Sequence, residues 1–338
     1  MRRRASALLA VASLVISIII GGCGEVEKVA IPVQKYPEKP ITVIVPFGMG
    51  GSTDLAARSL ERNAIKYLGQ PLVIMNKPGG AGTIGWNELA GANPDGYTVG
   101  IVAVDMLISS LLESSKYNYP TALEPIAQIS SSPMVLGVSI DQPWQTLDDL
   151  IEYAKKNPGQ LKVGNAGIGS IGHVVGEMFG QSANIKIEQV PFSGGSELIG
   201  SLLGGHVQLI FITPTAFKEH IKSGKVKILA VSGETRMADP LFASAPTFKE
   251  KGLDITLKNW FGIAVPKEMP IKDKDKLAEG LKSMIADPDF KKNMENMGLP
   301  VEYLSPQESQ DKWLSDSQIL SKRLKDTGVL EKVKAQKK

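Results

Sequence analysis

The sequence predicts an α/β protein in which parallel sheets, flanked by helices, are divided between two lobes. Three observations lead to this prediction. Runs of β-branched residues alternate with helical stretches, and glycine-rich turns follow several of those runs. The chain has 338 residues, 43% hydrophobic and 22% charged, which is ordinary for a globular protein of about two domains. This composition excludes disordered and fibrous classes.

The first 35 residues have the features of an export signal followed by a tether. Arg2 to Arg4 precede an uncharged run, 5–20, which is shorter than the roughly 20 apolar residues of a membrane-spanning helix. Ile20-Gly21-Gly22-Cys23 then resembles a bacterial lipoprotein box. We therefore expect a lipoprotein signal peptide at 1–22, lipidation of Cys23 and a tether at 23–35, with an uncleaved anchor helix as the alternative. The mature protein is expected to be exported and held on the membrane surface by its lipid.

Composition narrows the classes of partner and cofactor. The net charge of +3 comes from the three arginines before Cys23, because the 316 residues from Cys23 onward hold 35 basic and 35 acidic side chains. Nucleic-acid binding needs a clustered surplus of Lys and Arg and is therefore poorly supported. A single cysteine excludes a disulfide framework and a cysteine-based zinc site. His173, His206 and His220 lack the close spacing of a metal site, so we expect no metal and no cofactor.

Strand, glycine turn and helix follow one another along most of the chain. The segment 41–45 is entirely β-branched and leads through the turn 46–51 into a helical stretch from Thr53 to Tyr67. The same order predicts strands at 72–75, 98–102, 161–163, 185–190, 207–212 and 226–231, with helices through Leu89, over 171–181 and up to Leu203. Apolar spacing near 3.6 predicts C-terminal helices over 271–297, interrupted at Asp287-Pro288, and over 306–333. We expect the Lys-rich segment 332–338 to be a frayed, solvated end.

Four glycine turns are the candidates for ligand binding, at 46–51, 78–82, 164–170 and 191–195. Each lies after a strand and before a helix, where free backbone N–H groups and the positive helix end favour an anion. Glycine permits positive φ and a close approach of the backbone to a ligand. These turns therefore predict an anion-binding site.

Few charged side chains are available to hold such an anion. The chain beyond Cys23 has four arginines, Arg58, Arg62, Arg236 and Arg323. We therefore expect a carboxylate to be held mainly by backbone N–H groups and Ser or Thr hydroxyls. Asp54 stands four residues before Arg58 and is expected to pair with it on one helix face, or to accept a ligand ammonium or hydroxyl.

Two other functions fit parts of the same turns. Gly80 to Gly85 and Gly167 to Gly172 match the dinucleotide pattern G-x-G-x-x-G, and Glu188 lies about 20 residues after the second, but exported proteins rarely meet a nicotinamide pool. A P-loop is excluded, because no Gly-Lys-Ser or Gly-Lys-Thr follows these glycines. Ser170 and His173 stand three apart at a helix start, which suggests a serine hydrolase, yet no G-x-S-x-G surrounds Ser170. A helix cap or a ligand donor is the simpler role of Ser170.

A series of short motifs runs in order between Tyr36 and Lys325. They include Tyr36-Pro37-Glu38-Lys39-Pro40-Ile41, Val45-Pro46-Phe47, Asn76-Lys77-Pro78-Gly79, Pro94-Asp95-Gly96-Tyr97-Thr98, Val190-Pro191-Phe192-Ser193-Gly194, Leu203-Gly204-Gly205-His206-Val207, Ala245-Pro246-Thr247-Phe248 and Trp260-Phe261-Gly262. This series resembles the substrate-binding receptors of tripartite tricarboxylate transporters, also called Bug proteins. Met49, Thr83 and Thr213 depart from the family's pattern and are expected to change the pocket wall and its polar contacts.

The resemblance implies a two-lobed periplasmic-binding-protein fold of type II that closes on one small carboxylate and delivers it to integral-membrane transporter subunits. Lobe 1 would comprise 36–133 and 255–330, lobe 2 would comprise 134–254, and a tail would follow at 331–338. The ligand would be bound by Phe47, Gly48, Gly50, Gly51, Ser52, Thr53, Asp54, Gly82, Thr83 and Ile84 of lobe 1 and by Ser170, His173, Ser193 and Gly194 of lobe 2. We expect a monomer without catalytic residues. A sensory receptor that presents its ligand to a signalling partner is an alternative.

Overall fold

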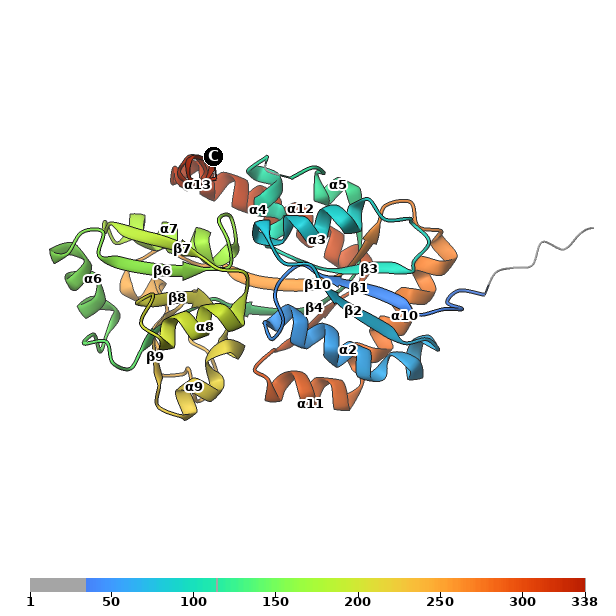
Figure 1. Ribbon diagram of the computed structural model, residues 1–338, viewed down its shortest axis with the longest axis horizontal. Coiled ribbons are helices and arrows are strands. Elements are labelled where there is room, and N and C mark those ends of the chain that lie inside the picture. Colours follow the sequence, from blue (N-terminus) through green and yellow to red (C-terminus); the bar gives the residue numbers. More distant parts are fainter. Residues whose placement is uncertain (1–34, 114, 338) are drawn as a thin grey trace, which may run out of the picture. The chain divides into compact units, whose positions relative to one another are not determined.

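Two β-sheets, here called sheet A and sheet B, form the centres of two lobes in the computed structural model (Figure 1). The structure describes residues 35–113 and 115–337, and those from Pro37 onward belong to one compact unit. The predicted signal peptide and Cys23 lie outside the described residues. Within the described ranges, no helix combines the length and the apolar character needed to cross a membrane.

Sheet A has six strands in the order β11-β4-β10-β3-β1-β2. β1 pairs in parallel with β2 and β3, whereas β10 runs antiparallel to β3 and β4, and β11 antiparallel to β4. The β-branched residues of β1 are almost all buried, as expected for a strand with neighbours on both edges and helices over the sheet. The strands are β1 (Ile41–Val45), β2 (Leu72–Asn76), β3 (Thr98–Ala103), β4 (Leu123–Pro133), β10 (Lys258–Pro266) and β11 (Val301–Leu304).

Sheet B has five strands in the order β7-β6-β8-β5-β9. β6 pairs in parallel with β7 and β8, and β5 lies antiparallel between β8 and β9. The strands are β5 (Val135–Ser139), β6 (Leu161–Asn165), β7 (Ile187–Pro191), β8 (Leu209–Ile212) and β9 (Val226–Val231). The core of this lobe includes Val135 of β5, Ile210 of β8 and Phe217, all fully buried.

The chain passes between the two sheets twice. β4 ends at Pro133 and β5 begins at Val135, so Met134 alone separates a strand of sheet A from a strand of sheet B. The return runs through the segment between β9 and β10. The predicted α/β class is therefore present, but both sheets are mixed rather than purely parallel, because the connecting strands run antiparallel to their neighbours. The predicted lobe boundaries at 133/134 and 254/255 stay a prediction.

Helices cover both faces of each sheet (Figure 1). In the sheet A lobe, α2 packs with α10 and α11 on one side, and α3 and α12 lie on the other. In the sheet B lobe, α7 and α8 lie on opposite sides of the sheet. The helices are α2 (Ser52–Leu68), α3 (Thr83–Ala90), α4 (Asp105–Leu111), α5 (Tyr119–Ala122), α6 (Leu147–Lys156), α7 (Ile171–Ser182), α8 (Gly195–Leu203), α9 (Lys218–Lys222), α10 (Ile271–Ala286), α11 (Pro288–Asn296), α12 (Pro306–Asp326) and α13 (Val329–Gln336).

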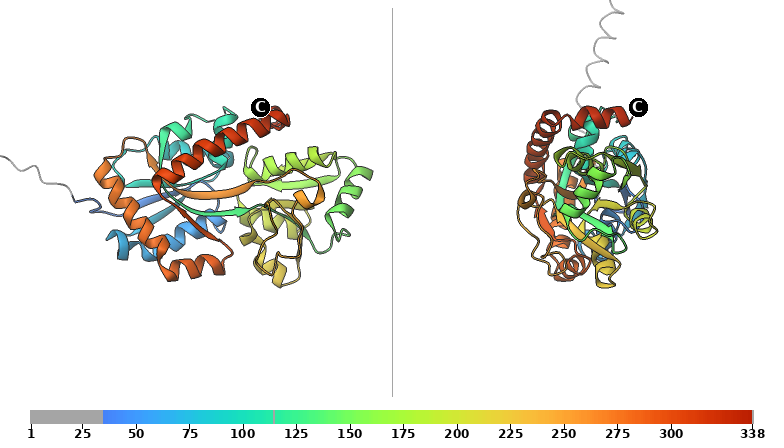
Figure 2. Two further views of the ribbon diagram at one scale, coloured as in Figure 1. Left: turned by 180° about the vertical axis from the view of Figure 1, so that it is seen from behind. Right: turned by 90° about the vertical axis from the view of Figure 1, so that its left-hand side faces the viewer.

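The C-terminal end differs from the frayed, solvated segment expected from sequence. Gly328, at φ 69°, ends the long helix α12, and α13 then packs against α7 of the sheet B lobe. Figure 2 shows the C-terminal helices running from the sheet A lobe to the sheet B lobe. Lys332 Nζ lies 2.5 Å from Glu177 Oε2, and Gln336 Nε2 donates to Glu177 Oε1 at 3.0 Å. The segment is therefore helical through Gln336 and not frayed, because α13 buries Val329, Leu330 and Val333, although Lys332 is exposed as expected.

Candidate functional site

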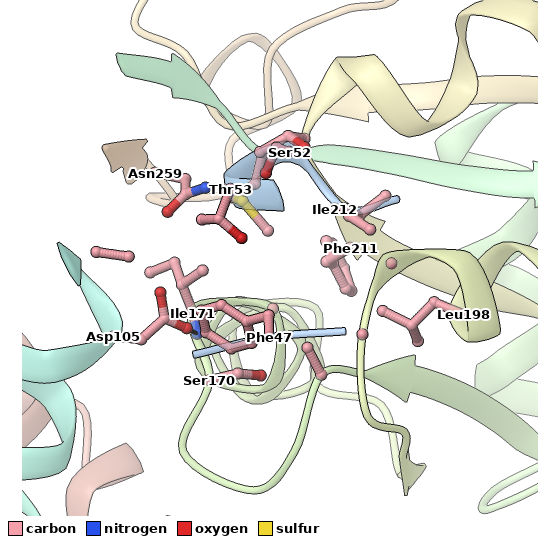
Figure 3. Close-up of a pocket in the computed structure, with 18 residues that line it drawn as sticks. Phe47, Ser52, Thr53, Asp105, Ser170, Ile171, Leu198, Phe211, Ile212 and Asn259 are labelled. Atoms are coloured by element: carbon pink, nitrogen blue, oxygen red, sulfur yellow. Dashed lines mark hydrogen bonds between the residues drawn. The ribbon is translucent and has the colours of Figure 1, made fainter. Parts of the chain in front are cut away.

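A cavity of about 80 Å³ lies between the two lobes, where the ends of strands from both sheets meet (Figure 3). Six of the fourteen predicted site residues line it: Phe47, Gly51, Ser52, Thr53, Ser170 and Gly194. Twelve further residues complete the lining: Ala103, Asp105, Met134, Ala166, Ile171, Gly172, Gly195, Leu198, Phe211, Ile212, Thr213 and Asn259. The roles of all fourteen predicted residues in ligand binding stay a prediction.

Two helices begin at the cavity without a side-chain cap. Gly51 is the N-cap of α2 and Gly194 is the N-cap of α8, and neither helix start receives a side-chain capping hydrogen bond. Both N-caps line the cavity, together with Ser52 and Thr53 in the first turn of α2. The first N–H groups of a helix have no partner within the helix, and the helix dipole makes this end positive. The cavity therefore has two helix ends suited to an anion.

The start of α7 is arranged differently. Ser170 is its N-cap, and the Ser170 Oγ accepts the backbone N–H of His173 at 3.3 Å. The N–H of Ile171 donates to Asp105 Oδ1 at 2.7 Å, so an acid from the sheet A lobe meets the helix start of the sheet B lobe. The Ser170 hydroxyl still lines the cavity and can donate its proton to a ligand.

His173 is fully buried and is not part of the cavity lining. Its Nδ1 accepts the N–H of Gly169 at 3.3 Å, and its Nε2 lies 3.9 Å from Glu177 Oε1. Burial lowers the pKa of His173 to about 4, against the opposite pull of the nearby Glu177 carboxylate. Among the described residues, no hydrogen bond joins the imidazole to Ser170 Oγ. Ser170 caps α7 and His173 packs within it. The two side chains lack the hydrogen bond between nucleophile and base that a serine hydrolase needs.

The glycine turns of the two lobes touch one another. The N–H of Gly48 donates to the Ser193 carbonyl at 3.4 Å, and a Cβ placed on Gly194 would lie only 3.0 Å from the Gly48 nitrogen. A second pair forms where a Cβ on Gly167 would lie 3.1 Å from the nitrogen of Ala81. From the sequence, these glycines are expected to let the backbone approach a ligand. In the structure, several of them let the backbones of the two lobes approach each other.

Asp54 is held by its own lobe. Its carboxylate accepts the N–H of Gly50 at 2.9 Å, Arg58 Nε at 3.0 Å and Asn76 Nδ2 at 3.0 Å. Burial raises the pKa of Asp54, but these hydrogen bonds, above all from Arg58, outweigh burial and hold the pKa below its ordinary value. Asp54 does not line the cavity, so of its two expected roles the structure places it in the pair with Arg58.

The remaining predicted residues also lie outside the cavity lining. Gly82, at φ 96°, lies against the Trp86 ring, and Thr83 Oγ1 donates to the Gly80 carbonyl at 2.9 Å. Ile84 is half exposed, and Ser193 donates through both N–H and Oγ to Glu197.

Asp105 and Asn259 are the polar lining residues that sequence reasoning missed. Burial raises the pKa of Asp105 to about 6, against the N–H of Ile171 and its own N–H, which lower it. Asp105 follows the apolar strand β3, so an acid at the carboxyl end of a buried strand was the available signal. Asn259 directly precedes the motif Trp260-Phe261-Gly262. Among the described residues, no group of three His, Cys, Asp or Glu side chains is placed to hold a metal ion.

Known proteins are similar to this chain in fold and in sequence. The family model described as tripartite tricarboxylate transporter family receptor matches residues 56–327. The UPF0065 protein in gbd 5'region of Cupriavidus necator is 33% identical over 285 residues, which cover 82% of this chain and 86% of that protein. The solved structure of the periplasmic binding protein BugD is 33% identical with a TM-score of 0.80, covering 87% of this chain and 99% of that chain.

A structure from R. palustris, determined with adipate, is 27% identical with a TM-score of 0.80, covering 87% of this chain and 99% of that chain. The match to the family model, the identity with the Cupriavidus necator protein and the likeness to BugD agree with one another. The chain therefore has the two-lobed fold of periplasmic binding proteins and belongs to the tripartite tricarboxylate transporter receptor family.

Proposed function

We propose that this protein is an extracytoplasmic solute receptor that binds one small carboxylate in the cavity between its lobes and delivers it to a membrane transporter. The observation that carries the proposal is the pair of uncapped helix starts, Gly51 of α2 and Gly194 of α8, which open into the same cavity. Membership of the receptor family and the adipate in a structural neighbour support this ligand class.

The lining residues suit a short organic acid. Each helix start carries about half a positive charge and offers free N–H donors, and the hydroxyls of Ser52, Thr53 and Ser170 add further donors. Leu198, Phe211 and Ile212 form an apolar wall for the carbon chain (Figure 3). Because the lining comes from both lobes, closing them would bury the ligand, and opening them would release it.

Ligand identification tests this proposal. Protein purified under native conditions is examined by mass spectrometry for a retained small acid, and calorimetry then measures binding of a panel of mono-, di- and tricarboxylates. We expect one carboxylate to bind with one-to-one stoichiometry, and NAD and a chromogenic ester to give neither binding nor turnover. Tight NAD binding, or ester hydrolysis that disappears in Ser170→Ala, would contradict the receptor function.

The proposal includes export, a lipid anchor on Cys23 and action as a monomer beside integral-membrane transporter subunits. The charged start, the uncharged run 5–20 and the position of Cys23 support the first two, and the receptor family supports the transporter. Uptake of the identified acid is measured in cells that lack this gene and in cells with the gene restored. Equal uptake in both strains would refute delivery to a transporter while leaving ligand binding intact.

A further inference from the structure

One end of the cavity contains a buried acid. Asp105 is 3% exposed, lines the cavity and is the only ionisable residue among the described residues of the lining. Its Oδ1 accepts the N–H of Ile171 at 2.7 Å, which holds the carboxylate group in place across the two lobes. No Lys, Arg or His of the described lining is present to neutralise it.

A second acceptor lies beside this acid. Asn259 is 8% exposed and lines the cavity, and its Oδ1 is buried without a hydrogen-bond partner. The N–H of Val104 donates to the Trp260 carbonyl at 3.2 Å, so Asp105 and Asn259 leave the same end of the β3 and β10 pair. Figure 3 shows the two side chains on the same side of the cavity, away from Leu198 and Ile212. This end of the cavity therefore presents one acceptor without a donor, Asn259 Oδ1, and a carboxylate that accepts only backbone N–H groups.

Two parts of the cavity lining have opposite requirements. The uncapped starts of α2 and α8 favour a negative group, whereas a carboxylate placed beside Asp105 would be repelled by it. A buried acceptor such as Asn259 Oδ1 is costly unless a ligand supplies a hydrogen. A ligand that carries both a carboxylate and a cationic donor satisfies both requirements.

We propose that the carboxylate bound here is an amino-carboxylate, with Asp105 as the specificity-determining residue that accepts its ammonium together with Asn259. This inference rests on the proposed function and adds to it the charge of the second ligand group. The raised pKa of Asp105, about 6, leaves the side chain mostly ionised at neutral pH, as a partner of an ammonium should be.

Pairs of acids that differ only by an amine test the inference. Calorimetry at pH 7.5 compares glutamate with glutarate, aspartate with succinate, and leucine with 4-methylpentanoate. We expect the amine-bearing member of every pair that binds measurably to bind more than tenfold tighter. In Asp105→Asn, the preference should fall by at least tenfold. Asp275→Asn, which makes the same change on the exposed face of α10, should keep the wild-type preference.

Several results would overturn the inference. One such result needs only the wild-type protein: glutarate, succinate or 4-methylpentanoate binds as tightly as its amine partner. An unchanged preference in Asp105→Asn would also do so. If no pair binds, the small acid found by mass spectrometry after native purification decides, because an acid without an amine contradicts the inference while leaving the carboxylate receptor in place. The absence of any bound acid would refute the proposed function itself.

Discussion

Replacing Gly194 by alanine should weaken ligand binding without unfolding the protein, because the added methyl group meets the backbone of the opposite lobe. The Cβ would lie 3.0 Å from the Gly48 nitrogen and 3.3 Å from the Gly48 Cα. Both are backbone atoms that no rotamer change can move, so the loops must separate by a few tenths of an ångström. Gly194 has φ 173°, an extended conformation that alanine adopts freely, so the effect is steric.

The size of the effect follows from the cost of overpacking. Extra methyl groups in well-packed sites cost about 1 to 3 kcal/mol. Because Gly48 and Gly194 belong to different lobes, opening the lobes relieves this cost. The substitution should therefore destabilise the closed, ligand-binding form relative to the open form. At 1.4 kcal/mol per tenfold change, the affinity should fall by about 5 to 150-fold.

Gly200→Ala is the matched control, because Gly200 lies within the same helix α8 and a Cβ added there would meet no atom within 4 Å outside its own stretch of helix. This variant should keep the wild-type affinity and gain roughly 0.5 to 1 kcal/mol of stability from the helix preference of alanine. Calorimetry with the identified ligand measures affinity, and urea denaturation measures the free energy of unfolding. An affinity of Gly194→Ala within twofold of wild type would refute the idea that this glycine contact limits lobe closure.

Four further predictions concern the anchor, the cap and the buried charges. Cys23→Ser should release the protein from the membrane fraction with unchanged ligand affinity, and retention in that fraction would contradict lipidation. Ser170→Ala should lower ligand affinity by about 5 to 150-fold, the loss of one charge-assisted hydrogen bond worth about 1 to 3 kcal/mol, and calorimetry giving wild-type affinity would remove this hydroxyl from the site. Lys332→Ala should lower the free energy of unfolding by about 1 to 3 kcal/mol, because the substitution removes the ammonium that pairs with the buried Glu177 carboxylate. An unchanged melting temperature would argue against this ion pair. The folded-state pKa of His173, about 4, lies below the unfolded value of about 6.5, so the unfolded state binds more protons between these pH values. The free energy of unfolding should therefore fall as the pH drops through that window. Urea denaturation at several pH values should show a weaker pH dependence in His173→Gln.

Local sequence preference decided most of the elements that were predicted. The strand 41–45 and the helix break at Asp287-Pro288 appear at the predicted residues, because a β-branched run and an X-Pro step act on the adjacent backbone. Asp287 also caps α11 by accepting the N–H groups of Asp289 and Phe290. Such signals need no partner from elsewhere in the chain, so a single sequence is sufficient to find them.

The strands that join the lobes were not predicted. β4 contains Gln128 and three consecutive serines, and its burial depends on β10 and β11, which come from much later in the chain. Its polar groups can be buried because their hydrogen-bond partners come from segments distant in the sequence. One example is the Pro300 carbonyl, which accepts from Ser130 Oγ at 2.6 Å. Periodicity cannot show a strand whose polar residues are satisfied only after folding.

The sequence by itself predicted an α/β chain with anion-binding helix starts and showed a motif series that resembles the receptor family, because strand-turn-helix order, glycine turns and short motifs are local patterns. Tertiary structure decided which turns reach the cavity and which glycines instead bring the two lobes together, as Gly48 and Gly194 do. It also decided the electrostatic character of the site, by pairing β3 with β10 so that Asp105 and Asn259 meet at one end. Strand pairing between distant segments is set by the packing of the whole sheet, so the local preferences of either strand do not predict it.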